Sequence, residues 1–409
     1  MLTQTRAPFC LALLLVLGLA LLSPGRAQTT LEYWHAHSGT PETVLNELID
    51  AFNGSQPDYR VVPRYAGNYA ESAIRLVAAL SAGNPPVLYE AEVTVFSRLA
   101  EEGSVLELSD LVSALPEDMV ADFYPALWDY GDLGGRYGLP WNMSLPVLFY
   151  NASIFRQLGV TPPTTWEEFE AAAARLTTRN TRGFIDVSMA FIFETMVSTR
   201  GGSVVTEEGR PNFDSPEAVE ALTMLRRLAE RGDSIPRSFG ELDLALIDFV
   251  RTKGMMAFAT FSYFPQGERF NLAFEPGVAA VPANPGSLGV PLADTQMVIL
   301  AGASEAQRQG AFAFWRFVVE PENQRRWVEA SYFLPVRRSV VPLLADWYAE
   351  DPQRSVVLDS LEHATTRPRV GAYAVWQGYL EEALERAVRG QMSPEAALAE
   401  AQRRALAAP

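Results

Sequence analysis

The chain has 409 residues, more than one hydrophobic core holds comfortably, so its length predicts two domains. Its composition, 48% hydrophobic and 20% charged, is typical of a soluble globular protein. The formal net charge of −16 argues against a nucleic-acid partner and against an anionic membrane surface. An anionic ligand would therefore need a local positive pocket.

The first 27 residues have the pattern of a secretory signal peptide. Arg6 precedes an apolar run at 9–22, and the small residues Gly25 and Ala27 follow it. This run is shorter than the roughly 20 apolar residues that a transmembrane helix needs. We therefore expect export to the periplasm or the cell exterior, with cleavage after about Ala27.

The one cysteine, Cys10, lies inside this N-terminal segment. After cleavage the chain would have no disulfide, no thiolate metal ligand and no cysteine nucleophile. The three histidines, His35, His37 and His363, are little material for a zinc site or a Ser–His triad. Neither a glycine-rich phosphate loop nor a Gly-x-Ser-x-Gly elbow is present. We expect no catalytic residue, no metal and no cofactor.

The next hundred residues alternate short strands with helices. Strands are predicted at 31–37, 57–65 and 87–90, and helices at 42–54, 70–82 and 93–102. This order predicts a mostly parallel sheet with covered faces, and such sheets bind ligands at the carboxyl ends of their strands. The rule selects three stretches as one rim: Trp34–Ser38, Gly67–Tyr69 and Glu90.

The stretch Tyr137–Asn151 is rich in strand-forming residues, but Pro140 and Pro146 interrupt it. Proline lacks an N–H and fixes φ, so neither residue suits the middle of a regular strand. The residues leave two interpretations, an edge strand or a crossing from one domain into the other. Trp141 either lines a cleft or packs beneath the hinge.

After Asn151 the pattern restarts and the chain ends in helices. A capping box, Thr165 with Glu168, marks one helix start. Strands are predicted at 185–189, 255–261, 277–282 and 291–301. Helices are predicted at 151–158, 165–176, 215–231, 242–251, 306–319, 321–330, 340–348, 356–363, 375–389 and 394–407.

Aromatic residues gather near the predicted strand ends, beside Gly, Asn and Ser. Core packing is the commoner explanation for any one of them. As a group without acid–base machinery they fit binding better than catalysis. A secreted glycosidase or esterase using Glu32 and Glu90 is the alternative, but nothing in the sequence sets the separation of these carboxylates.

Several short motifs occur in an order that resembles the extracellular solute-binding proteins of ABC importers, in the carbohydrate-type class. They are Tyr33-Trp34-His35, Phe52-Asn53 with Pro57, Gly103–Leu108, Leu148–Asn151, Pro163–Glu168, Gly254–Ala257 and Pro321–Gln324 with Trp327, Leu334 and Pro335. The resemblance covers nearly all of the mature chain. It implies capture of a small-molecule ligand, delivery to a membrane permease, and a monomer.

The resemblance also implies an α/β fold, the two-lobed periplasmic-binding-protein type II fold, with a ligand cleft between discontinuous lobes. We expect an N-terminal lobe of 28–142 and 293–332 and a C-terminal lobe of 146–290 and 336–409. In this fold the Pro140–Pro146 stretch becomes a crossing between the lobes. The other two crossings are expected at Gly289–Ala293 and Phe333–Val336.

Within this class the chain looks most like the glycerol-3-phosphate-binding proteins, because Tyr65–Tyr69 and Tyr89-Glu90 follow the Tyr-Trp-His motif. The resemblance implies that Glu90 accepts hydrogen bonds from glycerol hydroxyls and that the arginine of Arg369-Val370-Gly371 pairs with phosphate. The full set of expected ligand-binding residues is Trp34, Tyr69, Glu90, Ser144, Thr260, Ser262, Phe333 and Arg369.

Three positions depart from that subgroup. Leu292-Ala293 replaces a glycine pair, Phe333 stands where a tyrosine is usual, and no tryptophan occurs at 186–193, where Phe191 or Phe193 is the substitute. The ligand expected is therefore glycerol-3-phosphate or a glycerophosphodiester, with a neutral sugar or oligosaccharide as the alternative.

Overall fold

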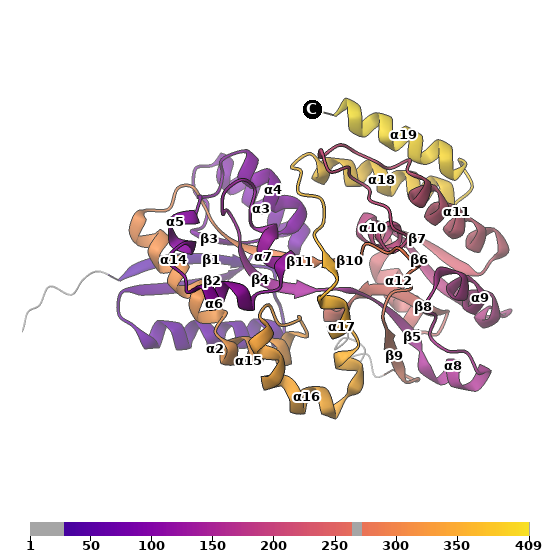
Figure 1. Cartoon of the computed structure of the whole chain (residues 1–409), viewed down its shortest axis with the longest axis horizontal. Helices are drawn as coiled ribbons and strands as arrows, with labels where there is room; N and C mark the ends of the chain where they lie inside the picture. The colour runs from indigo at the N-terminus through magenta and orange to yellow at the C-terminus, as the bar shows by residue number, and fades with distance from the viewer. Residues whose placement is uncertain (1–27, 264–271, 409) are drawn as a thin grey trace, which may run out of the picture.

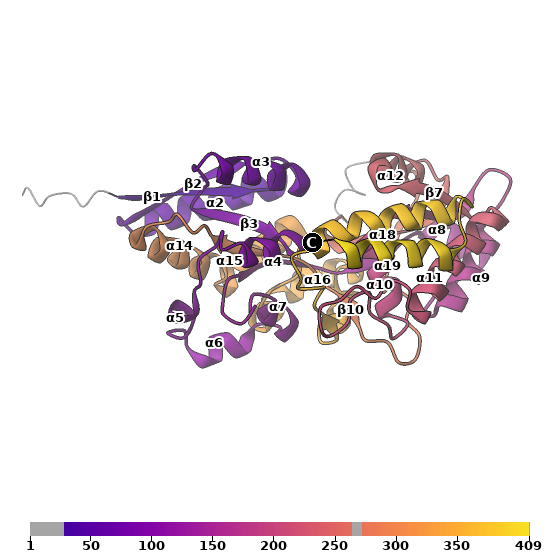
Figure 2. The ribbon, with the colours of Figure 1, turned by 90° about the horizontal axis from the view of Figure 1, so that it is seen from above.

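The computed structural model describes residues 28–263 and 272–408. The predicted signal peptide lies outside this range. The described chain forms two five-stranded sheets, β2-β1-β3-β11-β4 and β7-β6-β8-β5-β9. Each sheet with the helices packed on it forms one half of the molecule, called lobe 1 and lobe 2 below (Figure 1). Figure 2 shows the two lobes side by side, and in Figure 1 the chain passes from β4 in one lobe to β5 in the other.

In lobe 1 the first three strands are parallel, and β11 runs antiparallel between β3 and β4. The strands are β1 (Thr29–His35), β2 (Tyr59–Tyr65), β3 (Leu88–Glu92), β4 (Leu139–Ser144) and β11 (Ala293–Ile299). The helices are α2 (Thr40–Ser55), α3 (Tyr69–Ser81), α4 (Val93–Glu101), α5 (Ser109–Val112), α6 (Glu117–Asp122), α7 (Pro125–Tyr130), α14 (Glu305–Val318) and α15 (Pro321–Ser331).

Lobe 2 has its own core, centred on Phe169, Phe184 and Leu225. Its strands are β5 (Pro146–Asn151), β6 (Arg182–Ser188), β7 (Ser234–Ser238), β8 (Gly254–Thr260) and β9 (Pro276–Ala279). Its helical segments are α8 (Ala152–Leu158), α9 (Trp166–Leu176), α10 (Ala190–Ser198), α11 (Pro216–Arg231), η1 (Phe239–Glu241), α12 (Leu242–Val250), η2 (Phe261–Tyr263), α18 (Tyr373–Val388) and α19 (Pro394–Ala407).

Between the lobes, β10 (Val290–Pro291) pairs with β12 (Ala364–Thr365). Four short helical segments lead to β12: η3 (Arg338–Leu344), α16 (Ala345–Glu350), η4 (Pro352–Ser355) and α17 (Leu358–Leu361). The sequence predicted longer helices at 340–348 and 356–363. Pro342 lies inside η3, where it has no N–H to donate to the helix.

Both interpretations of the proline-interrupted stretch hold. Pro140 lies in β4, the edge strand of lobe 1, where its missing N–H is tolerated. Pro146 is the first residue of β5, which belongs to lobe 2. Leu145, which is 1% exposed, is the single residue between these strands, and its carbonyl accepts a bond from the Phe261 N–H at 2.9 Å.

The packing of 338–350 differs from the predicted lobe boundary at 336. Val340 and Leu344 of η3 form a cluster with Val328 of α15, and the Trp347 ring lies 5.1 Å from the Tyr332 ring. This segment therefore packs with lobe 1, and the chain joins the lobe 2 core with α18. The extended sequence at 333–336 did not predict this packing. A short extended segment has the same sequence pattern whether the chain stays in one lobe or passes into the other.

The sequence missed α10. All nine of its residues are buried. A helix that is buried all round has no polar face, and so it lacks the 3.6-residue alternation that marks an amphipathic helix. The capping box at Thr165 and Glu168 is present as predicted.

Candidate ligand-binding site

Glu90 lies in β3 of lobe 1 and is 1% exposed. Its Oε1 receives four side-chain contacts, each from a different part of the lobe. They are His37 Nε2 at 2.9 Å, Tyr69 Oη at 3.3 Å, Thr295 Oγ1 at 3.0 Å and Asn142 Nδ2. The other oxygen, Oε2, receives one long bond, from the Ala36 N–H at 3.5 Å. Glu90 thus has one saturated oxygen and one with spare acceptor capacity.

Asn142 is oriented by Trp327 of α15. The indole Nε1 of Trp327 donates to Asn142 Oδ1 at 2.7 Å. An indole N–H can only donate, so the oxygen of the Asn142 amide must face Trp327 and its NH₂ must face Glu90. This fixed amide supplies Glu90 with a donor that carries no charge.

The ionised form of Glu90 is favoured. Burial opposes ionisation, but His37, His35 and Thr295 outweigh it and lower the pKa of Glu90. The negative charge in turn affects its neighbours. Burial and then Glu90 raise the pKa of Tyr69 well above its ordinary value, so this hydroxyl keeps its proton and donates it. Burial lowers the pKa of His35 to about 4, so His35 is neutral at pH 7.

Aromatic rings surround His37 and Trp327 beside this carboxylate. The Phe333 ring lies 5.8 Å from His37 and stacks with Trp327 at 6.1 Å. Trp141 stacks with Trp327 at 5.0 Å and is fully buried in the lobe 1 core. Of the two interpretations of Trp141, packing beneath the crossing is therefore the one the structure supports.

Three predicted hydroxyl residues meet where the chain crosses between the lobes. Ser144 ends β4, Thr260 ends β8, and Ser262 follows in η2. Ser144 Oγ accepts the Ser262 N–H at 3.2 Å, and Thr260 Oγ1 lies 3.0 Å from Ser262 Oγ. Since Ser144 Oγ is used as an acceptor, its own proton is available for an acceptor such as a phosphate oxygen.

Strand β4 links the three hydroxyl residues at the crossing to the group of residues around Glu90. Asn142 and Ser144 are two residues apart on this strand, so their side chains share a face and are separated by about 7 Å. One end of this face offers donors around a carboxylate, and the other offers hydroxyl protons.

The two arginines of the 366–371 segment have different partners. Arg367 is buried and pairs with Glu194 of α10 at 2.8 Å and with Glu92, which ends β3, at 3.0 Å. Arg369 is exposed, and its Nη1 donates to the carbonyls of Asp129 at 2.9 Å and Asp132 at 3.1 Å. In the described residues Arg369 makes no ion pair with a carboxylate.

Trp34 is placed apart from the other predicted residues. Its Nε1 donates to Glu32 Oε1 at 2.7 Å, and the Arg64 guanidinium lies 4.8 Å over its ring. It packs with Leu76 of α3 and not with the aromatic group around Trp327. Adjacent residues of a strand face opposite sides of the sheet, so Trp34 and His35 cannot both face Glu90.

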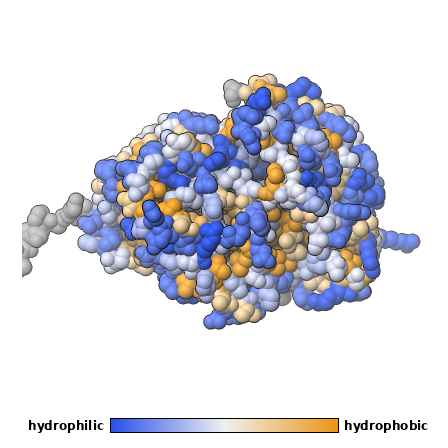
Figure 3. All heavy atoms as spheres, in the orientation of Figure 1, coloured by the Kyte–Doolittle hydropathy of each residue, from blue (hydrophilic) through white to orange (hydrophobic). Residues whose placement is uncertain are grey.

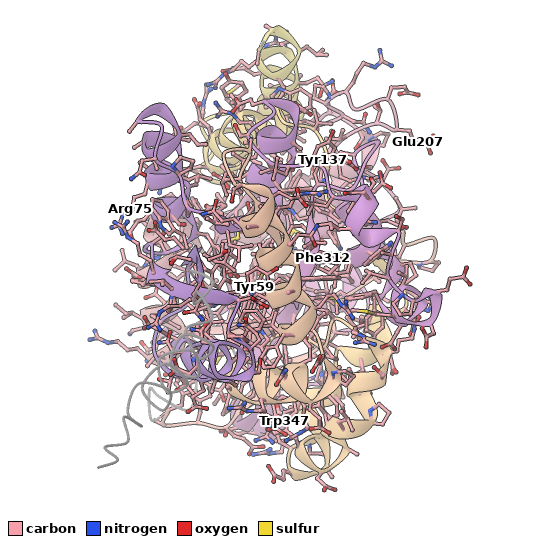
Figure 4. The ribbon with its side chains drawn as sticks, turned by 90° about the vertical axis from the view of Figure 1, so that its left-hand side faces the viewer. Tyr59, Arg75, Tyr137, Glu207, Phe312 and Trp347 are labelled. Atoms are coloured by element: carbon pink, nitrogen blue, oxygen red, sulfur yellow. The ribbon has the colours of Figure 1, made fainter. Side chains whose placement is uncertain are left out.

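Two hollows adjoin Arg369. The larger, about 630 Å³, lies against α10 and is lined by residues that include Glu194, Arg367 and Glu207. The smaller, about 530 Å³, is lined by residues of lobe 1 that include Glu101 and Tyr137. Arg369 lines both. Tyr137 and Glu207 both lie in the upper part of Figure 4. On the face drawn in Figure 3, hydrophobic residues occur in small groups among hydrophilic ones.

The sequence of the chain matches the family "Bacterial extracellular solute-binding protein" over residues 47–356, more than half of its length. The chain belongs to this family. It is a solute-binding component of an ABC import system. No helix in 28–263 or 272–408 combines the length and apolar character needed to cross a membrane.

Among curated relatives, the chain is 24% identical to the sn-glycerol-3-phosphate-binding periplasmic protein UgpB of Escherichia coli K12, over 94% of this chain and 93% of that protein. Among solved structures, UgpB of Mycobacterium tuberculosis in complex with glycerophosphocholine has a TM-score of 0.81, with 22% identity over 93% of this chain and 98% of that chain. The GacH receptor of Streptomyces glaucescens GLA.O, solved unliganded and with acarbose, also has a TM-score of 0.81, at 21% identity, covering 92% of this chain and 97% of that chain. The fold is therefore α/β and two-lobed, as predicted.

Sequence reasoning missed several residues of the Glu90 group. They are His37, Asn142, Thr295 and Trp327. His37 lies within the predicted rim, and the position of Asn142 between two prolines was a usable signal. Thr295 had no signal, since its role depends on β11 pairing with β3.

Proposed function

We propose that the protein captures glycerol-3-phosphate or a glycerophosphodiester outside the cytoplasmic membrane and delivers it to a permease without chemical turnover. The observation that carries the proposal is the difference between the two carboxylate oxygens of Glu90. Four donors saturate Oε1 and hold the carboxylate in place, while Oε2 keeps acceptor capacity. Such an oxygen can accept hydrogen bonds from the hydroxyl groups of a ligand.

The phosphate end fits the hydroxyls at the crossing. Ser144 lies about 7 Å from Asn142 along the same strand face, and Thr260 and Ser262 are joined to Ser144 through the Ser262 N–H and the hydroxyl contact between Thr260 and Ser262. We assign Arg369 as the cation that completes this end. Its present acceptors are neutral carbonyls, and a phosphate dianion binds a guanidinium more strongly than a carbonyl does. The UgpB relatives, whose names give glycerol-3-phosphate as their ligand, support the same ligand class.

A neutral sugar is the second candidate. One observation favours it: both arginines of the 366–371 segment have partners, and neither contacts the Glu90 group. The structure of GacH was solved with acarbose. At 21% identity, however, the similarity to GacH bears on the fold alone.

Isothermal titration calorimetry with glycerol-3-phosphate, glycerophosphocholine and maltose tests the proposal. We expect the two phosphate ligands to bind and maltose not to bind. Arg369→Ala should weaken both phosphate ligands by at least about tenfold, because the anion would lose its charged donor. Arg403→Ala is the matched control, since Arg403 is an exposed arginine of α19.

Binding of maltose alone would select the neutral-sugar candidate. Phosphate-ligand affinity unchanged in Arg369→Ala would refute the role of Arg369. A screen with chromogenic glycosides and phosphodiesters addresses the absence of turnover, and hydrolysis of either would overturn the transport proposal. The predicted signal peptide is checked by the N-terminal sequence of the exported protein, expected to begin near Gln28.

A further inference from the structure

Residues Arg367–Gly371, called the strap below, connect β12 to α18. In Figure 1 the gold chain passes up the middle of the molecule here, between the two lobes. The strap makes contacts with lobe 1 through every second residue. These contacts are Arg367 Nη1 to Glu92 Oε1 at 3.0 Å, Arg369 Nη1 to the Asp129 and Asp132 carbonyls at 2.9 and 3.1 Å, and the Gly371 N–H to Glu101 Oε1 at 2.8 Å.

The strap follows α4 from one end to the other. Glu92 is the N-cap residue of α4, and Glu101 is its last residue. The rise from Glu92 to Glu101 is about 13.5 Å at 1.5 Å per helical residue. The strap reaches both ends of this helix, since Arg367 bonds Glu92 at 3.0 Å and the Gly371 N–H bonds Glu101 at 2.8 Å.

Lobe 2 holds the strap through Arg367. Its guanidinium forms a bidentate pair with Glu194, at 2.8 Å for both bonds, and donates to Gln377 at 3.0 Å. The Arg367 and Glu194 side chains are 4% and 3% exposed, whereas Glu92 is 28% exposed. Val370 packs against the lobe 2 core.

This asymmetry lowers the cost of breaking the lobe 1 contact. Glu194 alone balances the charge of Arg367, so loss of the Glu92 contact leaves no unpaired buried charge. Glu92 is exposed enough to regain water when the contact opens. At the other end a Cβ at position 371 would displace the Glu101 carboxylate, which accepts the Gly371 N–H, and would lie 3.1 Å from the Arg98 Cα.

We propose that the strap is an interlobe clamp, in which Arg367 and Gly371 are positioning residues that hold Arg369 and that set how far the lobes open without ligand. The role of Arg369 toward a ligand rests on the proposed function. The clamp itself does not, and its test needs no ligand.

The test measures the distance between the lobes by pulsed electron–electron double resonance. Spin labels are attached at Ser81→Cys on α3 and Arg403→Cys on α19, in a Cys10→Ser background. Glu92→Gln keeps an oxygen to cap α4 but removes the charge that attracts Arg367. We expect Glu92→Gln and Gly371→Ala each to lengthen or broaden the ligand-free distance distribution.

Arg237→Met is the matched control. Arg237 pairs with Asp248 at 2.6 Å, and both residues lie in lobe 2. This variant should leave the distance between the labels unchanged. Glu194→Gln, which weakens the anchor inside lobe 2, should lower the melting temperature more than Glu92→Gln does, because it leaves Arg367 less well balanced.

Unchanged distance distributions in both Glu92→Gln and Gly371→Ala would overturn the clamp. If the clamp is present, affinity for a bound ligand should also fall by about fivefold in Glu92→Gln, since the closed arrangement becomes less populated. The two proposals fail separately. If neither phosphate ligand binds but the distances change in the variants, the ligand assignment is refuted and the clamp stands. If a phosphate ligand binds but the distances do not change, the clamp is refuted and the ligand assignment stands.

Discussion

Asp186 is a buried carboxyl group of β6 that the binding site does not use. It is 2% exposed, and its Oδ2 has no hydrogen-bond partner in the described chain. Burial alone raises the pKa of Asp186 to about 7. The folded protein therefore holds a proton here at pH values where the unfolded chain, with the ordinary pKa of 3.8, has lost it.

This difference predicts a pH-dependent stability. The contribution of Asp186 to folding is fully present below pH 3.8 and is lost as the pH rises through about 7. Asp186→Asn cannot ionise, so its gain in stability over the wild type should grow from pH 5 to pH 8. From pH 5 to the folded-state pKa of about 7 there are about two pH units, which correspond to a growth in this gain of at most about 3 kcal/mol. Urea unfolding at both pH values measures the difference.

Asp58→Asn, at an exposed position, is the control and should show no such trend. A gain for Asp186→Asn that is equal at pH 5 and pH 8 would contradict the assignment, because it would not depend on ionisation.

At the scale of elements, α15 supports the binding site without contacting Glu90. Trp327 on this helix fixes the amide of Asn142 on β4, and Asn142 then donates to Glu90 on β3. Three elements of lobe 1 are thus joined by two hydrogen bonds. The orientation of the Glu90 carboxylate therefore depends on how α15 packs.

Trp327→Phe should lower ligand affinity about three- to tenfold, because the Asn142 amide is then free to turn and present its oxygen to Glu90. Calorimetry with the ligand identified in the screen measures this. Trp315→Phe is a close control: Trp315 is equally buried in the same lobe, and its indole donates to the Pro140 carbonyl at 2.8 Å.

Both variants lose one buried indole hydrogen bond, so both should lose about 1 kcal/mol of stability. Only Trp327→Phe should lose affinity. Equal losses of affinity in the two variants would show that the effect is one of general stability.

At the scale of the whole molecule, the two sheets share the crossing at Leu145 and are joined again by the β10–β12 pair and the strap. A molecule built this way can close its lobes about a few connecting residues. Small-angle scattering should show a decrease of a few per cent in a radius of gyration of about 21 Å at saturating ligand. A compound that calorimetry shows not to bind serves as the control, and no compaction with a bound ligand would contradict lobe closure.

Much of this protein follows from its sequence. The strands and helices at 29–101, the capping box at Thr165 and the crossing at Pro140–Pro146 are all local in origin, because capping, periodicity and proline act over a few residues. Family membership was also predicted, from motifs spread over the chain, and is confirmed. The eight predicted ligand-binding residues stay a prediction.

Only the tertiary structure decided the partners of Glu90 and the course of the chain after 336. Thr295 is 205 residues from Glu90 in sequence and reaches it because β11 enters the sheet antiparallel between β3 and β4. Periodicity tells which face of a strand a residue occupies, but not which distant strand lies beside it. The sequence likewise marked the strap only by the arginine of Arg369-Val370-Gly371 and did not show which elements the strap contacts. Its contacts with α4 and α10 exist only because the fold brings both lobes to it.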